Sequence, residues 1–337
     1  MKKSLLYIGN KLSGHNATVT SIETLGLLLE KEGYTVFYAS SMKSKILRLS
    51  EMILRTIQYR NKVEYVLIDT YSTYNFWYAF IVSQLCRIFS LKYIPKLHGG
   101  DLPNRLEKSP ILSRMIFKHA YINIAPSDYL LEAFKNRGYA RLICIPNTIE
   151  IQNYSFKSRK KCRPKLLWVR SLSDIYNPEM ALKVFFKIKK DFPDAKLCMV
   201  GPDKDGNKRK LKQMAKKMGL DVVFTGKLSK SKWVKLSEQY DIFLNTTHYD
   251  NTPISVIEAI ALGLPVISTN VGGIPYLLKD RETALLVDDN DVDGMVAGIR
   301  ELISDENLKD KLVMNALNLV QQFDWDIVKN KWLKILV

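Results

Sequence analysis

The chain has 337 residues, of which 47% are hydrophobic and 25% charged, and its formal net charge is +17. This length exceeds the size at which a single core usually stops growing, so two domains are expected. The composition is ordinary for a soluble globular protein, but the charge favours an anionic partner: nucleic acid, anionic lipid or a phosphorylated small molecule. The basic excess is spread over both halves of the sequence, which speaks against a dedicated DNA-reading face.

The cysteines and the lengths of the apolar runs indicate the cellular compartment. Four cysteines are far apart and form no CxxC pair: Cys86, Cys144, Cys162 and Cys198. They are expected to be buried, reduced thiols in a cytoplasmic protein. The apolar run at the start ends at Gly9, too early for a signal peptide. The longest apolar stretch, 76–89, contains Gln84 and Arg87 and is shorter than the ~20 residues of a membrane span, so no transmembrane helix is expected.

The first half alternates short β-branched runs with helical patterns, as in βαβ units. Strands are expected at 4–9, 35–40, 63–70, 93–100, 121–127 and 142–148. Helices are expected at 18–32, 42–60, 76–89 and 128–138. This order predicts one doubly wound parallel sheet.

The same alternation restarts after a basic stretch at 155–161. Strands are expected at 165–171, 196–202, 222–227, 241–247, 265–270 and 283–289, and helices at 178–192, 207–219, 229–240, 253–262, 292–304, 306–322 and 324–337. The fold class is therefore α/β, with two facing Rossmann-like doubly wound domains and an interdomain cleft. The expected domains are 1–152 plus 323–337, and 164–322, joined by a linker at 153–163.

Polar and glycine residues follow many of these strands, at the edge of a parallel sheet where ligands bind. They are Gly14, His15, His98, Arg170, Gly201, Gly226 and Lys227. Arg170 comes directly after an apolar strand and could bind phosphate oxygens bidentately. An ordinary surface arginine that pairs with Asp174 is the alternative.

The stretch YDNTPISVIEAIALGLPVISTNVGG, 249–273, combines an apolar helix with two acids. Thr252 and Pro253 fit an N-cap followed by proline at the first helical position. The N–H groups of Ile254 and Ser255 would then point out of the helix start, toward a phosphate or a sugar hydroxyl.

Asp250 precedes this helix and Glu258 lies within it. The two acids are too far apart to share one atom but could hold two parts of one extended ligand, Glu258 through vicinal ribose hydroxyls. The alternative for Glu258 is a buried acid paired with a lysine or arginine, although no basic residue occurs in the helix itself.

This segment resembles the family 4 glycosyltransferases, which are retaining enzymes with two facing Rossmann-like domains (GT-B fold). Their Glu-x7-Glu motif is matched here as Asp-x7-Glu, followed by ALGLPVI and a Gly-Gly turn. Weaker similarities cover most of the chain: the loop after the first strand, the His98 loop, APS at 125–127, IPN at 145–147, VGP at 200–202 and FTGK at 224–227.

The resemblance implies a metal-independent transfer of a sugar from a nucleoside-diphosphate donor, such as a UDP-sugar, without a further cofactor. By position, Glu258 would hold the donor ribose, Asp250 the hydroxyls of the transferred sugar, and Arg170 the diphosphate, while His98 would lie near the sugar. Donor-binding positions carried over or hypothesised with them are Gly14, His15, Tyr176, Asn177, Gly201, Gly226, Lys227, Leu228, Asn251, Thr252, Pro253, Ile254, Ser255, Gly272 and Gly273. The acceptor would be a glycan, plausibly lipid-linked, in surface polysaccharide biosynthesis.

Two positions depart from the family pattern. The first acid of the motif is Asp250 rather than Glu, and a family lysine that joins the arginine at the diphosphate is absent near Tyr176 and Asn177. We expect these two side chains to donate hydrogen bonds in its place. The missing cation keeps open a catalytically weak nucleotide-sugar-binding scaffold as the alternative function.

Further interpretations concern the surface. The basic amphipathic region 43–60 could lie on anionic membrane as a peripheral contact, or could simply pack its apolar face on the sheet. The sequences DKD at 203–205 and DVD at 291–293 resemble metal-binding acids but are expected to be loop acids or helix caps. No nucleic-acid-binding motif is present, and the Asp-x7-Glu helix argues against a nucleotide-sugar epimerase.

Overall fold

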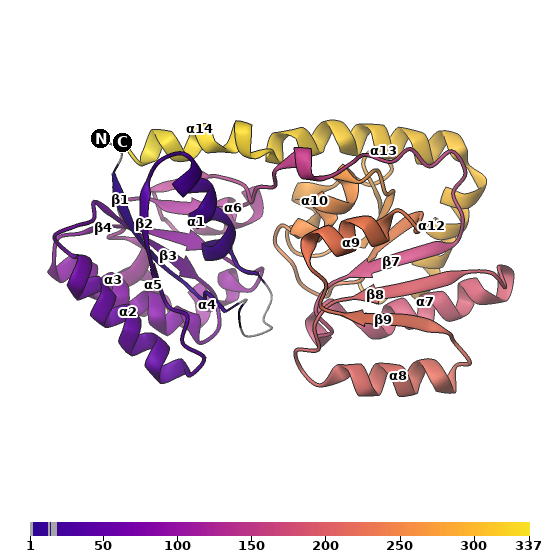
Figure 1. Cartoon of the computed structure of the whole chain (residues 1–337), viewed down its shortest axis with the longest axis horizontal. Coiled ribbons are helices and arrows are strands. Elements are labelled where there is room, and N and C mark those ends of the chain that lie inside the picture. Colours follow the sequence, from indigo (N-terminus) through magenta and orange to yellow (C-terminus); the bar gives the residue numbers. More distant parts are fainter. Residues whose placement is uncertain (1–2, 13, 15–18) are drawn as a thin grey trace. The chain divides into compact units, whose positions relative to one another are not determined.

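The computed structural model describes residues 3–12, 14 and 19–337, and the chain divides into two compact units. Unit 1 consists of residues 1–148 and 325–337, and unit 2 of residues 149–324. Each unit contains one six-stranded, all-parallel sheet with helices around it (Figure 1). The expected pair of Rossmann-like doubly wound sheets is confirmed.

In unit 1 the sheet order is β2-β1-β3-β4-β5-β6. Its strands are β1 Ser4–Ile8, β2 Thr35–Ala39, β3 Tyr65–Thr70, β4 Lys92–Leu97, β5 Asn123–Ala125 and β6 Leu142–Cys144. Its helices are α1 Ser21–Lys31, α2 Lys45–Tyr59, α3 Asn75–Ile88, α4 Leu102–Lys108, α5 Pro110–Phe117, α6 Asp128–Lys135 and α14 Trp325–Ile335. Helices α4 and α5 were not expected from the sequence.

Apolar side chains of alternating strand positions point to opposite faces of this sheet and form separate cores. One core joins α1 and α14 to the sheet, and another joins α2 and α3 to its other face. The closing helix is held in unit 1 by Trp325, whose indole N–H donates to Glu32, and by Tyr34, whose hydroxyl donates to the Leu336 carbonyl.

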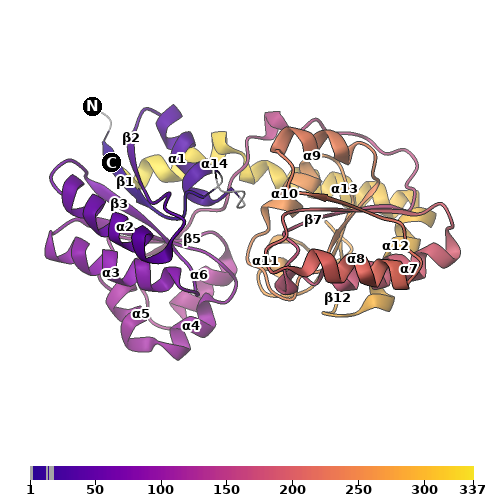
Figure 2. The ribbon, with the colours of Figure 1, turned by 60° about the horizontal axis from the view of Figure 1, so that its bottom comes forward.

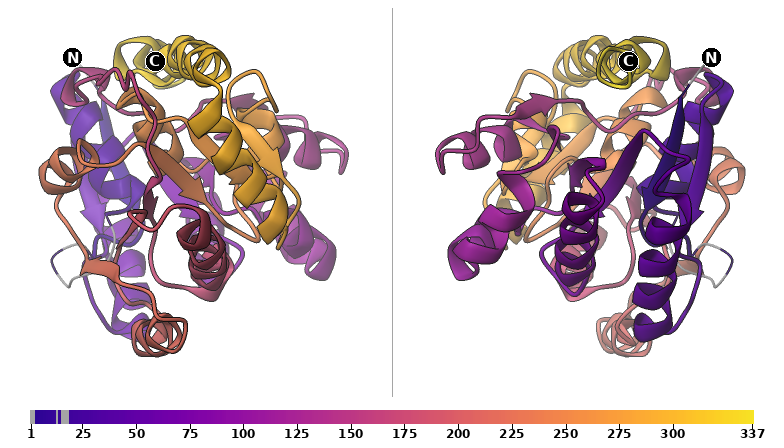
Figure 3. Two further views of the ribbon diagram at one scale, coloured as in Figure 1. Left: turned by 90° about the vertical axis from the view of Figure 1, so that its right-hand side faces the viewer. Right: turned by 90° about the vertical axis from the view of Figure 1, so that its left-hand side faces the viewer.

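In unit 2 the sheet order is β12-β11-β10-β7-β8-β9. Its strands are β7 Lys165–Val169, β8 Lys196–Val200, β9 Val222–Gly226, β10 Ile242–Asn245, β11 Val266–Thr269 and β12 Leu285–Val287. Its helices are α7 Pro178–Asp191, α8 Asn207–Lys217, α9 Lys230–Ser237, α10 Ile254–Ala261, α11 Ile274–Leu277, α12 Val292–Ser304 and α13 Glu306–Val320, with 3-10 turns η2 Ile151–Asn153, η3 Asp174–Tyr176 and η4 Gln321–Phe323. Helices lie on both sides of this sheet (Figure 3, left).

In each sheet the direction in which successive strands are added reverses at one point. In unit 2 the chain order turns back between β7 and β10, and in unit 1 it turns back between β1 and β3. Ligands of open α/β sheets bind beyond the carboxyl ends of the strands at such a switch point. The loops after β7 and β10, and those after β1 and β3, are therefore the places to look for a site.

The segment 153–163, expected to be a linker, is instead part of unit 2. Arg159 is buried and donates to the carbonyls of Lys157, Ser237, Tyr240 and Leu262. Lys309 of α13 is also buried and donates to the carbonyls of Arg159 and Lys160. These bonds tie the basic segment to unit 2.

Candidate active site

Arg170 and Asp250 meet at the switch point of unit 2. Arg170 directly follows β7, Asp250 lies in the loop between β10 and α10, and a guanidinium nitrogen donates to Asp250 Oδ2. The expected alternative, a pair between Arg170 and Asp174, is wrong: Asp174 instead accepts from Asn207 at 2.8 Å. The Nε–H of Arg170 is buried and has no acceptor among the described residues. This donor is therefore free for a bound anion.

Tyr176 contacts this arginine, whereas the side chain of Asn177 is bound to other residues. The Arg170 guanidinium lies 4.7 Å from the centroid of the Tyr176 ring, a cation–π contact. Burial raises the pKa of the Tyr176 hydroxyl, and the charge of Arg170 opposes the shift. Asn177 has a left-handed backbone, caps α7 by accepting from Met180 N–H, and donates its amide to Asn290. The Asn177 side chain is thus already engaged at both its oxygen and its nitrogen.

Three glycines allow the backbone segments of this site to pack closely against one another. A Cβ at Gly201 would overlap the carbonyl oxygen of Arg170, and a Cβ at Gly273 would overlap that of Asn251. Gly272 has a positive φ of 54° and packs against the backbone of Asp250, to whose carbonyl Gly273 N–H donates at 2.9 Å. Only residues without side chains allow these backbones to approach so closely.

Helix α10 begins one residue later than expected. Pro253 is the N-cap with an extended backbone, and Ile254 is the first helical residue, so Thr252 as the N-cap is wrong. The first N–H groups of an α-helix have no intrahelical acceptor, which applies to Ile254 and Ser255. The Ser255 hydroxyl is also buried with no partner among the described residues. Gly263 ends the helix in the left-handed conformation, as the sequence indicated.

Glu258 is 3% exposed and is held by two partners. The hydroxyl of Tyr154 donates to Oε1 at 2.7 Å, and the ammonium of Lys230, at the start of α9, pairs with the same oxygen. Burial and the charge of Glu258 raise the pKa of Tyr154, so this hydroxyl stays a donor. The buried, paired acid that the sequence left as the alternative is present in the structure.

The remaining predicted donor-binding positions of unit 2 lie at the end of β9 and in the loops that follow β9 and β10. Gly226, with a φ of 74°, ends β9, and the exposed Lys227 and half-buried Leu228 follow it. Asn251 and Thr252 are buried at 4% and 7% exposure. Gly226 and Gly201 are joined because Gly201 N–H donates to the Gly226 carbonyl at 3.0 Å.

The acids considered for metal binding have other partners. Asp205 accepts from Ser173, Asp291 caps α12 by accepting from Gly294 N–H, and Asp293 pairs with Lys187. Within residues 3–12, 14 and 19–337, no three His, Cys, Asp or Glu side chains gather as metal ligands would.

His98 of unit 1 follows β4 and lies beside the switch point of that sheet. Its Nε2–H donates to Asp69 Oδ1 at 2.8 Å, and Tyr7 donates its hydroxyl to the same oxygen at 3.1 Å. Burial and the nearby ammonium of Lys96 lower the pKa of His98, whereas Asp69 acts in the opposite direction. The imidazole is stacked on Tyr71, with ring centroids 4.7 Å apart.

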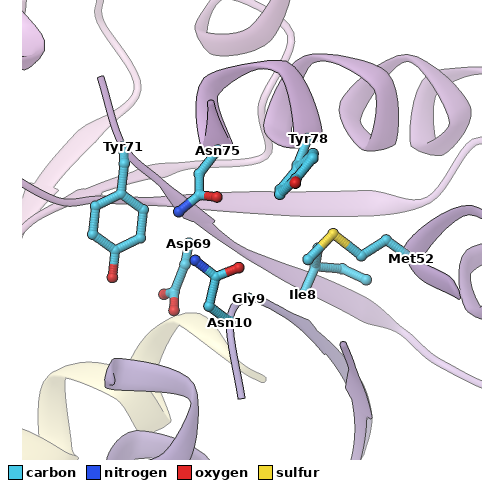
Figure 4. A pocket seen from close by; sticks show the side chains of 8 residues that line it. All are labelled: Ile8, Gly9, Asn10, Met52, Asp69, Tyr71, Asn75 and Tyr78. Carbon is cyan, nitrogen blue, oxygen red and sulfur yellow. The ribbon is translucent and has the colours of Figure 1, made fainter. Parts of the chain in front are cut away.

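A small pocket opens beside Asp69 at the same place (Figure 4). It is lined by Ile8, Gly9, Asn10, Met52, Asp69, Tyr71, Asn75 and Tyr78. Asp69 Oδ2 is buried without a partner among the described residues, and a Cβ at Gly9 would lie 2.7 Å from it. Gly14 is exposed, and His15 lies outside the described residues.

The sequence pattern of the group 1 glycosyl transferases matches residues 150–318, about half of the chain and nearly all of unit 2. The chain belongs to the group 1 glycosyl transferases. The matched range contains Arg170, Asp250 and Glu258.

Curated proteins similar to this group 1 glycosyl transferase are distant. An uncharacterized glycosyltransferase of Haemophilus influenzae is 28% identical over 210 residues, which are 61% of this chain and 57% of that protein. An α-1,4-N-acetyl-D-galactosaminyltransferase of Campylobacter jejuni, named for an acceptor ending in diNAcBac-PP-undecaprenol, is 27% identical over 185 residues, or 54% of this chain and 50% of that protein. The chain thus spans about half the length of these two relatives.

Solved structures share the fold over the whole length. Anabaena HepE, in complex with UDP and glucose, has a TM-score of 0.78 at 16% identity and covers 100% of this chain and 99% of its own. A sucrose-phosphate synthase of Thermosynechococcus elongatus has a TM-score of 0.80 at 16% identity, covering 99% and 98%. At this level of identity the likeness establishes the GT-B fold of this group 1 glycosyl transferase.

Several side chains at these sites were not predicted. Tyr154 and Lys230 contact Glu258 from positions 104 and 28 residues away in sequence, and Asp69 lies 29 residues before His98. No local pattern marks such partners. Asp69, however, is an acid at the end of the apolar strand β3, and that position could have drawn attention to it.

Proposed function

We propose that the protein is a retaining glycosyltransferase that moves a sugar from a nucleoside-diphosphate donor, such as a UDP-sugar, to a glycan or lipid-linked acceptor in surface polysaccharide biosynthesis. The observation that carries the proposal is Arg170 with its unpaired Nε–H at the switch point, beside Asp250 and the start of α10. The four cysteines are free thiols, which supports a cytoplasmic location.

The diphosphate would bind between Arg170 and the helix start. An arginine has five N–H donors, so Arg170 can keep Asp250 and still bind phosphate oxygens through Nε. The N–H groups of Ile254 and Ser255 supply further donors of positive partial charge. These groups stabilise the negative charge that develops on the diphosphate as the glycosidic bond breaks.

The ribose would bind at Glu258 and the transferred sugar at Asp250. Tyr154 and Lys230 hold Glu258 through Oε1, and ribose hydroxyls would donate to the same carboxylate. In the retaining reaction we propose, the leaving phosphate takes the proton of the acceptor hydroxyl while the new bond forms on the same face. No protein base and no metal ion are required for this step.

Tyr176 is proposed to support Arg170 in the absence of the family lysine. Its ring contacts the guanidinium face, so Tyr176→Ala should raise the donor KM more than Tyr176→Phe does. If Tyr176→Phe combined with Asn177→Ala leaves donor KM and turnover unchanged, hydrogen-bond donation by these two side chains is ruled out.

The function is tested by incubating the full chain with a panel of UDP- and GDP-sugars and measuring slow release of the nucleoside diphosphate. One donor should be hydrolysed, also in the presence of EDTA, and Arg170→Met should abolish the release. Arg163→Met is the matched control, because Arg163 precedes β7 whereas Arg170 follows it, so the two arginines lie at opposite ends of this strand. Equal loss in both variants would contradict the assignment of Arg170.

One observation favours a second function, binding without turnover. Positions 175–177 carry Ile, Tyr and Asn, so no lysine joins Arg170 there. A catalytically weak scaffold would bind one nucleotide sugar and release no nucleoside diphosphate from it. Calorimetric binding is measured with the same panel beside the release assay: binding of one sugar without release supports the scaffold, and binding with release supports the transferase.

A further inference from the structure

Helix α2 presents large apolar side chains to solvent. Ile46, Leu47 and Leu54 are 78%, 57% and 64% exposed. Positions 46 and 54 are eight residues apart and 47 and 54 are seven apart, so the three side chains share one face of the helix. An exposed strip of this kind on a soluble surface marks an interaction site.

Packing within unit 1 does not require this strip. The opposite side of α2 carries Met52, which is 1% exposed and lies in the core with the half-buried Leu49. Arg48 is on that side too, buried at 7% exposure, and donates to the Met42 and Lys43 carbonyls and to Asn10. The helix therefore packs one apolar face on the sheet, as the alternative interpretation expected, and exposes a second one.

The neighbouring helix extends the exposed surface with aromatic rings. Tyr74 and Trp77, at the start of α3, are 66% and 46% exposed. The Lys45 ammonium lies 3.8 Å from the centroid of the Tyr74 ring, and Tyr78 donates its hydroxyl to the Lys45 carbonyl. The first turns of α2 and α3 thus lie side by side (Figure 2). We call Ile46, Leu47, Leu54, Tyr74 and Trp77 the α2–α3 apolar patch.

The charges around the patch are positive. Lys43 and Lys45 are exposed at the N-terminal end of α2, where the helix dipole is also positive, and Arg60 and Lys62 are exposed beyond its other end. The acid of this helix, Glu51, accepts from Ser40 and lies 3.9 Å from Arg55. The patch therefore combines aliphatic and aromatic side chains with exposed lysines.

We propose that the α2–α3 apolar patch docks on an anionic membrane surface. Leu and Ile side chains bury their apolar atoms at the headgroup boundary, Trp and Tyr rings prefer that boundary, and lysines attract anionic headgroups. A neutral protein groove would not select the lysines at the rim. No helix in the described part of the chain is long and apolar enough to span a membrane, so the contact is peripheral. The inference rests on the surface of unit 1 and goes beyond the proposed transfer reaction.

The test is flotation of the full chain with vesicles of phosphatidylcholine alone and of phosphatidylcholine mixed with phosphatidylglycerol. The wild type should float with the anionic vesicles. Leu47→Ser should lower its partition by about tenfold, since burying a leucine at least partly is worth more than one kcal/mol. The matched control is Leu27→Ser on α1, because Leu27 is 56% exposed on the opposite side of the sheet and should leave the partition unchanged.

A second variant tests the charges. Lys43→Gln with Lys45→Gln should lower partition onto the anionic vesicles by about 30-fold and leave binding to neutral vesicles unaltered. Thermal unfolding checks that each variant is folded. The proposal is overturned if the wild type does not float with anionic vesicles, or if Leu47→Ser and Leu27→Ser reduce flotation equally. It is also overturned if Leu47→Ser acts only by dissociating a dimer, measured by sedimentation. Donor hydrolysis without vesicles is measured separately, so its failure would contradict the transfer function and not the docking surface.

Discussion

Tyr154 offers the sharpest test of how Glu258 is held. Replacing Tyr154 with phenylalanine removes one hydroxyl, whose bond to Glu258 Oε1 is 2.7 Å long and buried. A hydrogen bond to a charged group contributes about 1.5–3 kcal/mol, so the free energy of unfolding of unit 2 should fall by that amount. Lys230→Met removes the other partner, but the Lys230 side chain is 54% exposed, so its loss should be at most about 1 kcal/mol.

Urea unfolding of the two variants shows directly which of them loses more free energy of unfolding. Tyr240→Phe is the matched control, because Tyr240 is a buried tyrosine of the same unit whose hydroxyl bonds to the neutral thiol of Cys198. Its loss should be nearer the 0.5–1.5 kcal/mol or so of a neutral hydrogen bond. The reasoning is refuted if Lys230→Met destabilises the protein more than Tyr154→Phe, or if Tyr154→Phe costs no more than the control. If Glu258 also binds the donor, Tyr154→Phe should raise the donor KM in the hydrolysis assay.

Three further substitutions test single features of the fold. Burial lowers the pKa of Lys96 from 10.5 to about 8, so between these pH values the unfolded chain holds more protons than the folded one and stability rises with pH. Relative to Lys96→Met, the free energy of unfolding of the wild type should therefore increase by up to about 3 kcal/mol over this range, measured by urea unfolding at a series of pH values. A difference between the two proteins that does not change with pH would contradict this prediction. Gly273→Ala should cost about 2 kcal/mol or more, because its methyl group would overlap the Asn251 carbonyl, and a neutral effect in denaturant unfolding would show that the loop relaxes. Arg48→Met should lower the melting temperature clearly, since three partly buried hydrogen bonds are lost, whereas Arg60→Met, at an exposed position, should change stability by no more than about 0.5 kcal/mol. Equal effects of the two substitutions would contradict a packing role of Arg48.

The alternation of strands and helices was predictable because each strand is a short, nearly continuous apolar run that is covered on both faces. Eleven of the twelve strands fall within the expected ranges, and β4 begins one residue early, at Lys92. Helices α4 and α5 were not predicted because they are short and meet at Ser109–Pro110. Neither is long enough to show a helical period in the sequence. The start of α10 was predicted one residue too early because proline is favoured at the first helical position, whereas the backbone of Pro253 is extended and the helix begins at Ile254.

Functional positions were predictable where they belong to one short sequence motif, and not where they depend on contacts between residues far apart in sequence. The Asp-x7-Glu spacing and the arginine after β7 could be read directly. Arg170 pairs with Asp250, 80 residues away in sequence, rather than with the nearby Asp174 because β7 and β10 are neighbours in the sheet. The same holds for Lys230, which supplies Glu258 with a cation from another helix.

The basic segment 153–163 has a practical consequence for dissecting the chain. A fragment that began at residue 164 would keep Glu258 and Lys309 but lose Tyr154 and the carbonyls of Arg159 and Lys160. It would then contain a buried ammonium without its acceptors and a buried carboxylate without its hydroxyl donor, each of which costs free energy. Limited proteolysis within this segment should therefore unfold unit 2 instead of releasing it intact, and a stable fragment should begin no later than Ile149, where unit 2 begins.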